Sequence, residues 1–177
     1  VMLRRSMDDP RLSEQMPDLL ETILEVEVDK KAYDEAYNTC MDHLEHYRTT
    51  GSGSIPPGFL LNILTELRHA AGRAKIDTAV NWAVDYYTQT GKPLVIFAHH
   101  KDVVSSIEKG LNLKAQCGLI TGSTADKDRQ RIITGFQEGK VQFLICSTLA
   151  MKEGVNLDAA DTALFVERQW VPAHEKQ

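Results

Sequence analysis

The hydrophobic pattern of the chain changes near residue 92. From there on, short continuous apolar runs alternate with amphipathic stretches, and the first run is PLVIFA at 93–98. Strands that are buried on both faces produce such runs, and their alternation with helices is typical of a parallel sheet with right-handed crossovers. The pattern predicts helices at 103–111 and 127–137 and strands at 93–98, 117–122, 141–146 and 163–167.

Residues 1–91 instead have a mainly helical pattern. Apolar positions recur at helical spacing over 30–50, 59–72 and 75–90, and Asp29 is the candidate N-cap of the first of these helices. The β-branched run Thr22–Val28 predicts one further strand. We therefore expect an α/β fold in two parts, a linker and helical segment at 1–91 and an α/β domain at 92–177.

The composition is that of an ordinary soluble globular protein. Of the 177 residues, 42% are hydrophobic and 25% are charged, and no apolar run approaches the roughly 18 residues that a membrane helix needs. We therefore expect no membrane partner. The three cysteines, Cys40, Cys117 and Cys146, are scattered along the chain, which argues against a disulfide framework or a zinc site and for a reducing compartment.

The charge distribution is uneven, although the net charge is only -5. Residues 92–140 carry 8 basic and 5 acidic residues, a net charge of +3, whereas residues 1–91 carry 9 and 15, a net charge of -6. The middle part is the only basic one, because residues 141–177 carry 3 basic and 5 acidic residues. Two interpretations remain open, surface scatter or an anion-binding face.

Polar residues follow the first predicted strand. His99, His100 and Lys101 come directly after PLVIFA. The carboxyl ends of parallel strands are where such sheets bind ligands, so these side chains are candidates for a phosphate contact. The alternative is a solvated loop that leads into a helix.

Small hydroxyl residues mark the ends of two further strands. Gly122, Ser123 and Thr124 end the second strand, and Ser147 and Thr148 follow the third. Glycine allows a close backbone approach to a ligand, and hydroxyl and amide groups bind anions. The alternative is helix capping, by Thr124 or Asp126.

A turn is predicted farther along the chain, at Gly154 and Asn156, where an amide could reach a sugar hydroxyl or a phosphate. Asp158 and Asp161 follow, and we interpret both as turn or capping residues, with no metal site. The sequence contains no P-loop, no acidic pair after a strand for magnesium, no G-x-S-x-G elbow and no H-E-x-x-H motif. The chain alone does not contain the parts of a complete enzyme.

Taken in order, these segments resemble the second RecA-like lobe of superfamily 2 helicases, specifically the SNF2 family. PLVIFAHHKDVV is similar to motif IV, and GLITGSTADKDRQRIITGFQEG is similar to the family's block of G-S-T, then R-Q, then F. FLICSTLAMKEGVNLDAADTALFVERQWVPAHEKQ resembles motif V and the approach to motif VI, and LRRSMDDPRLSEQMPDLLETILEVEV resembles the segment that leaves the first lobe. The resemblance covers essentially the whole chain. It implies a RecA-like three-layer domain with a parallel β-sheet, preceded by a mainly helical N-terminal segment.

Members of this family are ATP-driven motors that track on double-stranded DNA. The partners implied for this chain are double-stranded DNA and the first RecA-like lobe of the same polypeptide. The implied cofactors are ATP and Mg2+, bound mainly by that first lobe. The ATP-binding residues implied here, acting with the other lobe, are Gly154, Asn156 and Gln177, and the implied DNA-binding residues are His99, His100, Lys101, Gly122, Ser123, Thr124, Ser147, Thr148 and Leu149.

The sequence ends at Gln177, where the family continues into the motif VI arginines that contact the γ-phosphate. In-line phosphoryl transfer needs the metal, the P-loop lysine and an arginine together. We therefore expect no catalytic residue and no ATP hydrolysis in this chain alone. Two alternatives remain, the second lobe of an RNA helicase or a catalytically silent RecA-like interaction module. The resemblance predicts a cytoplasmic or nucleoid location in a bacterium or phage and a nuclear one in a eukaryote.

Overall fold

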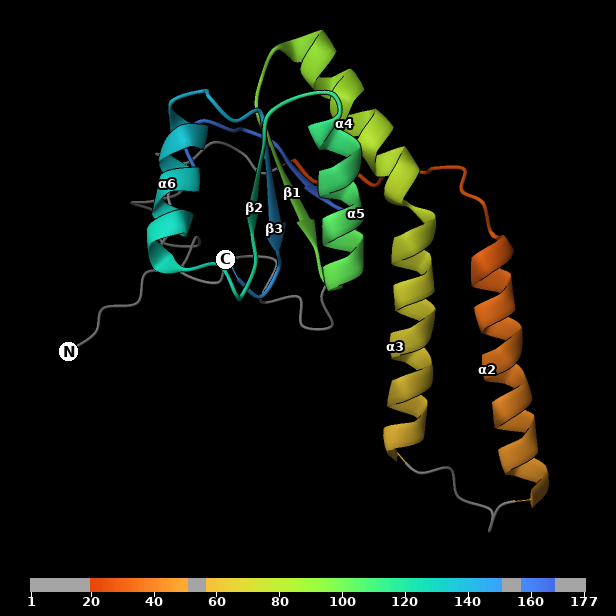
Figure 1. Cartoon of the computed structure of the whole chain (residues 1–177). Coiled ribbons are helices and arrows are strands. Elements are labelled where there is room, and N and C mark those ends of the chain that lie inside the picture. The colour runs from red at the N-terminus through yellow and green to blue at the C-terminus, as the bar shows by residue number, and fades with distance from the viewer. Residues whose placement is uncertain (1–19, 51–56, 151–156, 168–177) are drawn as a thin grey trace, which may run out of the picture.

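A four-stranded parallel sheet forms the centre of the protein (Figure 1). The structure is a computed structural model that describes residues 20–50, 57–150 and 157–167. The strand order is β2-β3-β1-β4, and all three pairings are parallel, as the alternating pattern predicts. The strands are β1 (Leu94–Ala98), β2 (Cys117–Ile120), β3 (Phe143–Ser147) and β4 (Ala163–Phe165).

Helices cover both faces of this sheet and make three layers. The helices α4 (Ile76–Thr90) and α5 (Lys101–Asn112) lie on one face, and α6 (Asp126–Gln137) lies on the other (Figure 1). The helices predicted at 75–90, 103–111 and 127–137 are therefore confirmed. The start of α5 lies two residues before the predicted one, at Lys101, so that only His99 and His100 separate the helix from β1.

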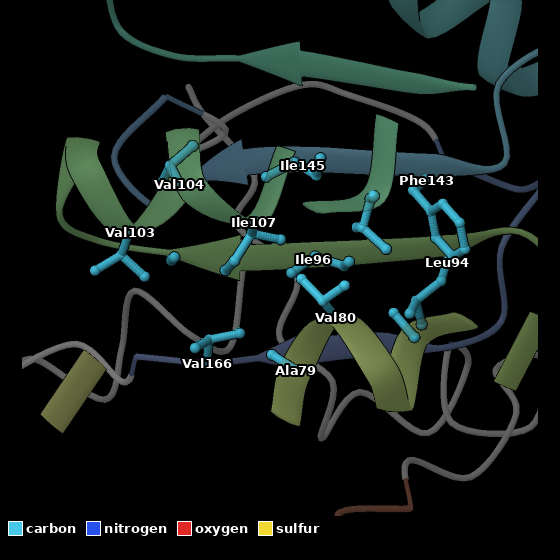
Figure 2. Close-up of a cluster of buried hydrophobic side chains, with 13 residues drawn as sticks. Ala79, Val80, Leu94, Ile96, Val103, Val104, Ile107, Phe143, Ile145 and Val166 are labelled. Carbon is cyan, nitrogen blue, oxygen red and sulfur yellow. The ribbon is translucent and has the colours of Figure 1, made fainter. Parts of the chain in front are cut away.

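Each face of the sheet has its own hydrophobic core. Alternate residues of one strand point to opposite faces, so Leu94 and Ile96 pack toward α4 and α5 while Val95 packs toward α6. Every residue of β3 is buried. This is why the strands appear in the sequence as continuous apolar runs. Figure 2 shows the larger cluster, whose labelled members are Ala79, Val80, Leu94, Ile96, Val103, Val104, Ile107, Phe143, Ile145 and Val166.

Two long antiparallel helices precede this unit. The helices α2 (Lys31–Thr50) and α3 (Pro57–Ala74) lie side by side and reach away from the sheet (Figure 1). Cys40 is buried in α2, and the rings of Tyr47 and Phe59 lie 5.1 Å apart between the helices. The side chain of Asp29 accepts a hydrogen bond of 2.9 Å from the amide of Lys31, so it caps α2 as predicted.

The strand predicted at Thr22–Val28 is wrong. Residues 20–30 have no regular secondary structure, and the segment pairs with neither edge strand of the sheet, β2 or β4. Leu20 and Ile23 are 87% and 84% exposed. A β-branched run forms a strand only where a neighbouring strand supplies backbone partners, and here none does.

The segment 91–93 separates α4 from the first strand, and its first residue is a glycine. Gly91 has φ of +68°, and its amide donates to the carbonyl of Tyr87, which ends α4 with a left-handed residue. Although it precedes residue 92, α4 supplies Ala79, Val80 and Ala83 to the core. The division of the chain at residue 92 stays a prediction.

Candidate functional site

The parallel strands bring the candidate residues to one edge of the sheet. Ala98 at the end of β1 pairs with Ser147 at the end of β3. Ile120 in β2 pairs with Cys146, and Phe97 pairs with Phe165 at the end of β4. The four carboxyl ends therefore lie next to one another, where parallel sheets bind their ligands.

The turn after β1 carries the two histidines and the lysine. His100 is the N-cap residue of α5, without a side-chain cap bond, and Lys101 is the exposed first residue of the helix. Burial lowers the pKa of His99, and the neighbouring His100 and Arg68 act in the same direction. His99 is therefore mainly neutral at pH 7, and Lys101 supplies a fixed positive charge beside it.

A buried carboxylate holds this turn from the end of β4. Glu167 is 5% exposed. Its Oε2 atom accepts hydrogen bonds from the amides of His99 (2.7 Å) and His100 (2.9 Å), and its Oε1 atom lies 2.5 Å from Nδ1 of His100. A buried carboxylate is costly unless it is fully hydrogen-bonded, and these three contacts supply that requirement.

The helix α3 closes this cluster from the side. The imidazole ring of His69 stacks on that of His100 at 4.2 Å, and Nε2 of His69 lies 2.7 Å from Asp102 in the first turn of α5. Arg73 donates to the same carboxylate at 2.7 Å. Gly72 lies directly against Glu167, since a Cβ atom there would lie 2.4 Å from Oε1.

Sequence reasoning missed this second set of residues. Glu167 has one signal, since it is a charged residue that directly follows the apolar run Ala163–Val166 at the end of a predicted strand. His69 and Arg73 have another, since residues four apart share a helix face. Neither signal predicts which residue is contacted, because the contacts to His100 and Asp102 join segments about 30 or more residues apart in the sequence.

The turn after β2 is closed by its own hydroxyls. The amide of Thr121 donates to Oγ1 of Thr124 at 2.9 Å, and the hydroxyls of Thr121 and Ser123 are 2.9 Å apart. The capping predicted for Thr124 or Asp126 is wrong, because the N-cap of α6 is Ala125 and has no side-chain cap bond. Gly122 and Ser123 are exposed at the sheet edge.

The end of β3 is more buried than the predicted DNA contact of Ser147 and Thr148 implies. Ser147 and Thr148 are 9% and 7% exposed, and the hydroxyl of Thr148 donates to the carbonyl of Ala98 at 3.0 Å. Leu149 is 51% exposed. Arg129 of α6 donates to the carbonyl of Ala150 at 2.6 Å and thereby ties the helix to this turn.

Other predicted features are only partly described. Gly154, Asn156 and Gln177 lie outside the described residues. Asp161 binds Lys92 and the hydroxyl of Tyr86, so it joins the start of β4 to α4 and the start of β1. Among the described residues, no three His, Cys, Asp or Glu side chains form a group that could hold a metal ion, and no helix is long and apolar enough to cross a membrane.

Comparisons with known proteins agree with this architecture. The family model described as "Helicase conserved C-terminal domain" matches residues 74–177. The chain is 31% identical over 100 residues to the SWI/SNF-related matrix-associated actin-dependent regulator of chromatin subfamily A-like protein 1 of Bos taurus, covering 56% of the chain and 11% of that protein. It is 33% identical over 92 residues to Helicase SWR1 of Debaryomyces hansenii, covering 51% of this chain and 6% of that protein. The chain therefore spans about a tenth or less of these relatives.

Solved structures show the same fold. The Sulfolobus solfataricus SWI2/SNF2 ATPase C-terminal domain superposes with a TM-score of 0.62 at 21% identity, over 79% of this chain and 70% of that one. The Sulfolobus solfataricus SWI2/SNF2 ATPase core domain superposes with a TM-score of 0.71 at 20% identity, over 98% of this chain and 39% of that one. The predicted RecA-like fold with its helical N-terminal part is thereby confirmed.

The contact of Gly72 with Glu167 yields a stability prediction. Alanine normally stabilises a helix interior by about 1 kcal/mol over glycine. At Gly72 we expect the opposite, a loss of about 1–2 kcal/mol in the free energy of unfolding, because the new methyl group displaces the Glu167 carboxylate from its hydrogen bonds. Urea unfolding measures this difference. The control is Gly58→Ala in the same helix, where a Cβ atom meets nothing within 4 Å, and equal effects of both changes would contradict the prediction.

The ion pairs of Asp102 predict a pH dependence. Burial raises the pKa of this carboxyl, but hydrogen bonds from Arg73 and His69 outweigh burial and lower the pKa from 3.8 to about 2. A depressed pKa in the folded state stabilises the fold above about pH 4 and ceases to do so as the pH falls toward 2. Asp102 is partly exposed, so we expect Asp102→Asn to cost less than about 1 kcal/mol at pH 7.

The measurement is urea unfolding of the unmodified protein and of Asp102→Asn between pH 7 and pH 2. The difference between them should shrink below pH 4. Asp85→Asn, which changes an exposed carboxylate of α4, serves as the control. A difference that stays constant down to pH 2 would refute the assignment.

Proposed function

The chain belongs to the helicase conserved C-terminal domain family, within its SNF2 branch, and from this we propose that it is the C-terminal motor lobe of an ATP-dependent double-stranded DNA translocase. In this proposal the lobe binds the DNA backbone at the carboxyl edge of its sheet. It closes over ATP that the first RecA-like lobe of the same polypeptide holds.

The observation that carries the proposal is the convergence of donors at that edge. Lys101 supplies a fixed positive charge beside the turn after β1, and Gly122 and Ser123 are exposed at the turn after β2. These residues lie in the basic part of the chain, 92–140. Hydroxyl, amide and ammonium groups contact phosphate oxygens without reading base sequence, which suits a motor that tracks along any sequence.

The exposure of the candidates refines their roles. His99, His100, Lys101, Gly122, Ser123, Thr124 and Leu149 are the residues that we assign to the DNA surface. Ser147 and Thr148 act mainly by fixing the turn after β3, since both are buried and the Thr148 hydroxyl is engaged with Ala98.

ATP and Mg2+ belong chiefly to the first lobe in this proposal. Gly154, Asn156 and Gln177 are the residues of this chain that we assign to the nucleotide when the lobes close. ATP supplies the free energy for motion of one lobe against the other. Hydrolysis needs the P-loop lysine, the metal and an arginine together, so we expect this chain alone to be inactive.

The main alternative is the second lobe of an RNA helicase. The names of the relatives favour DNA, because one is a regulator of chromatin and another is the TATA-binding protein-associated factor MOT1 of Saccharomyces cerevisiae, 32% identical over 88 residues, covering 47% of this chain and 5% of that protein. A silent interaction module is a further alternative. In such a module, the residues at the strand ends would not need to bind nucleic acid.

Steady-state ATP hydrolysis distinguishes these functions. The full-length protein should hydrolyse ATP about tenfold faster or more with duplex DNA than without it, and residues 1–177 alone should not hydrolyse ATP at all. Stimulation by RNA instead of duplex DNA would favour the RNA helicase. An absence of hydrolysis in the full-length protein under every condition would favour the interaction module.

The salt dependence of DNA binding tests the surface itself. Each phosphate that a lysine neutralises contributes about one to the slope of log affinity against log salt concentration. Lys101→Ala should therefore reduce this slope by about one, measured by fluorescence anisotropy of labelled duplex DNA. Lys109→Ala, at the opposite end of α5, is the control and should leave the slope unchanged. An unchanged slope for Lys101→Ala would remove this turn from the DNA surface.

A further inference from the structure

We propose that Glu167 is a positioning residue for the nucleic-acid contact made by the His99–His100 turn. The proposal rests on the proposed function, because it assumes that this turn meets a nucleic-acid backbone. It assigns to Glu167 no contact with DNA or ATP. Its role is to hold the turn that makes the contact.

The hydrogen bonds of Glu167 fix both the backbone and a side chain of the turn. One carboxylate oxygen accepts from two consecutive amides, those of His99 and His100. The other lies 2.5 Å from Nδ1 of His100. A carboxylate only accepts hydrogen bonds, so Nδ1 must carry the proton, and the orientation of the His100 ring is set with it.

The surroundings leave Glu167 little freedom to move. Its side chain is 4% exposed. The backbone of Gly72 closes one side, since even a methyl group there would collide with the carboxylate. The neighbouring carbonyl, that of Val166, accepts a hydrogen bond of 3.2 Å from Nζ of Lys75. The carboxylate is thus clamped between α3 and the turn after β1.

The His100 ring is held from its faces as well. His69 stacks on it at 4.2 Å with an interplanar angle of 16°, and His99 meets it edge-on at 5.0 Å. His69 is in turn held by Asp102, which also binds Arg73. A ring that is fixed by Glu167 at one edge and by His69 on a face presents one geometry to a ligand, and such preorganisation lowers the entropic cost of binding.

Glu167 connects the ends of two strands. Glu167 lies two residues after the end of β4, with Val166 between them. The carboxylate thereby ties the turn after β1 to the end of β4. No other described side chain spans these two strand ends with bonds to both amides.

Three variants of the full-length protein test the proposal. Glu167→Ala removes every bond to the turn. Glu167→Gln keeps an acceptor oxygen for the two amides, but its amide nitrogen faces Nδ1 of His100, so the histidine must shift its proton to Nε2. Asp161→Ala is the matched control, because it removes a hydrogen-bonded carboxylate at the opposite end of β4.

The readouts are the dissociation constant for labelled duplex DNA and the kinetics of DNA-stimulated ATP hydrolysis. Glu167→Ala should raise the dissociation constant and the half-saturating DNA concentration by about tenfold, with the maximal rate at saturating DNA within about twofold. Glu167→Gln should raise both by about threefold, and Asp161→Ala should leave both unchanged. A merely structural role would lower the maximal rate through loss of folded protein, without changing the half-saturating concentration.

The outcomes separate this inference from the proposed function. Unchanged DNA affinity in both Glu167 variants would overturn the inference but would not contradict the proposed translocase function. An equal loss in Asp161→Ala would overturn it too, since the effect would then be general destabilisation. If Glu167→Ala does not fold, Glu167→Gln decides alone. If RNA instead of duplex DNA stimulates hydrolysis, the translocase proposal fails, and the dissociation constants and kinetics of the same variants are then measured with RNA. If the unmodified protein binds neither polymer, both proposals fall.

Discussion

The parallel direction of the four strands is the constraint on which the rest of this structure depends. Parallel neighbours cannot be joined by a tight turn, so each connection must cross back over a face of the sheet. The crossovers place α5 and α6 on opposite faces, and burial of both faces follows from this. The same constraint brings His99, Ser123 and Thr148 to one edge, although the sequence separates them by more than 20 residues.

Much of this architecture could be predicted from the sequence because burial on both faces leaves a strong signal. The run Leu94–Ala98 has no polar position, since Val95 packs toward α6 while Leu94 and Ile96 pack toward α5. The strand predicted at Thr22–Val28 failed for a complementary reason. Its composition suits a strand, but strand formation depends on a partner whose presence local sequence does not report.

The candidate site could be predicted only as a set of strand ends. Chain order and strand direction suffice to place His100 and Thr148 at one edge. They do not indicate which side chains face the ligand and which hold the turns together. Thr148 is engaged with the carbonyl of Ala98, and Thr124 closes its own turn instead of capping α6. Glu167 escaped prediction because two of its three partners are backbone amides, which any residue type can supply, and the third, His100, lies 67 residues away in the sequence.

The long hairpin has a mechanical consequence that follows from its attachment. With 18 residues, α3 is about 27 Å long, and the contacts of His69, Gly72 and Arg73 with Asp102, His100 and Glu167 all lie near its carboxyl end. The rest of the helix packs against α2. It is therefore a lever whose fulcrum lies beside the His100 ring. A displacement at the far end of the hairpin would therefore tilt α3 about that contact and move His69, close to the pivot, by a much smaller distance.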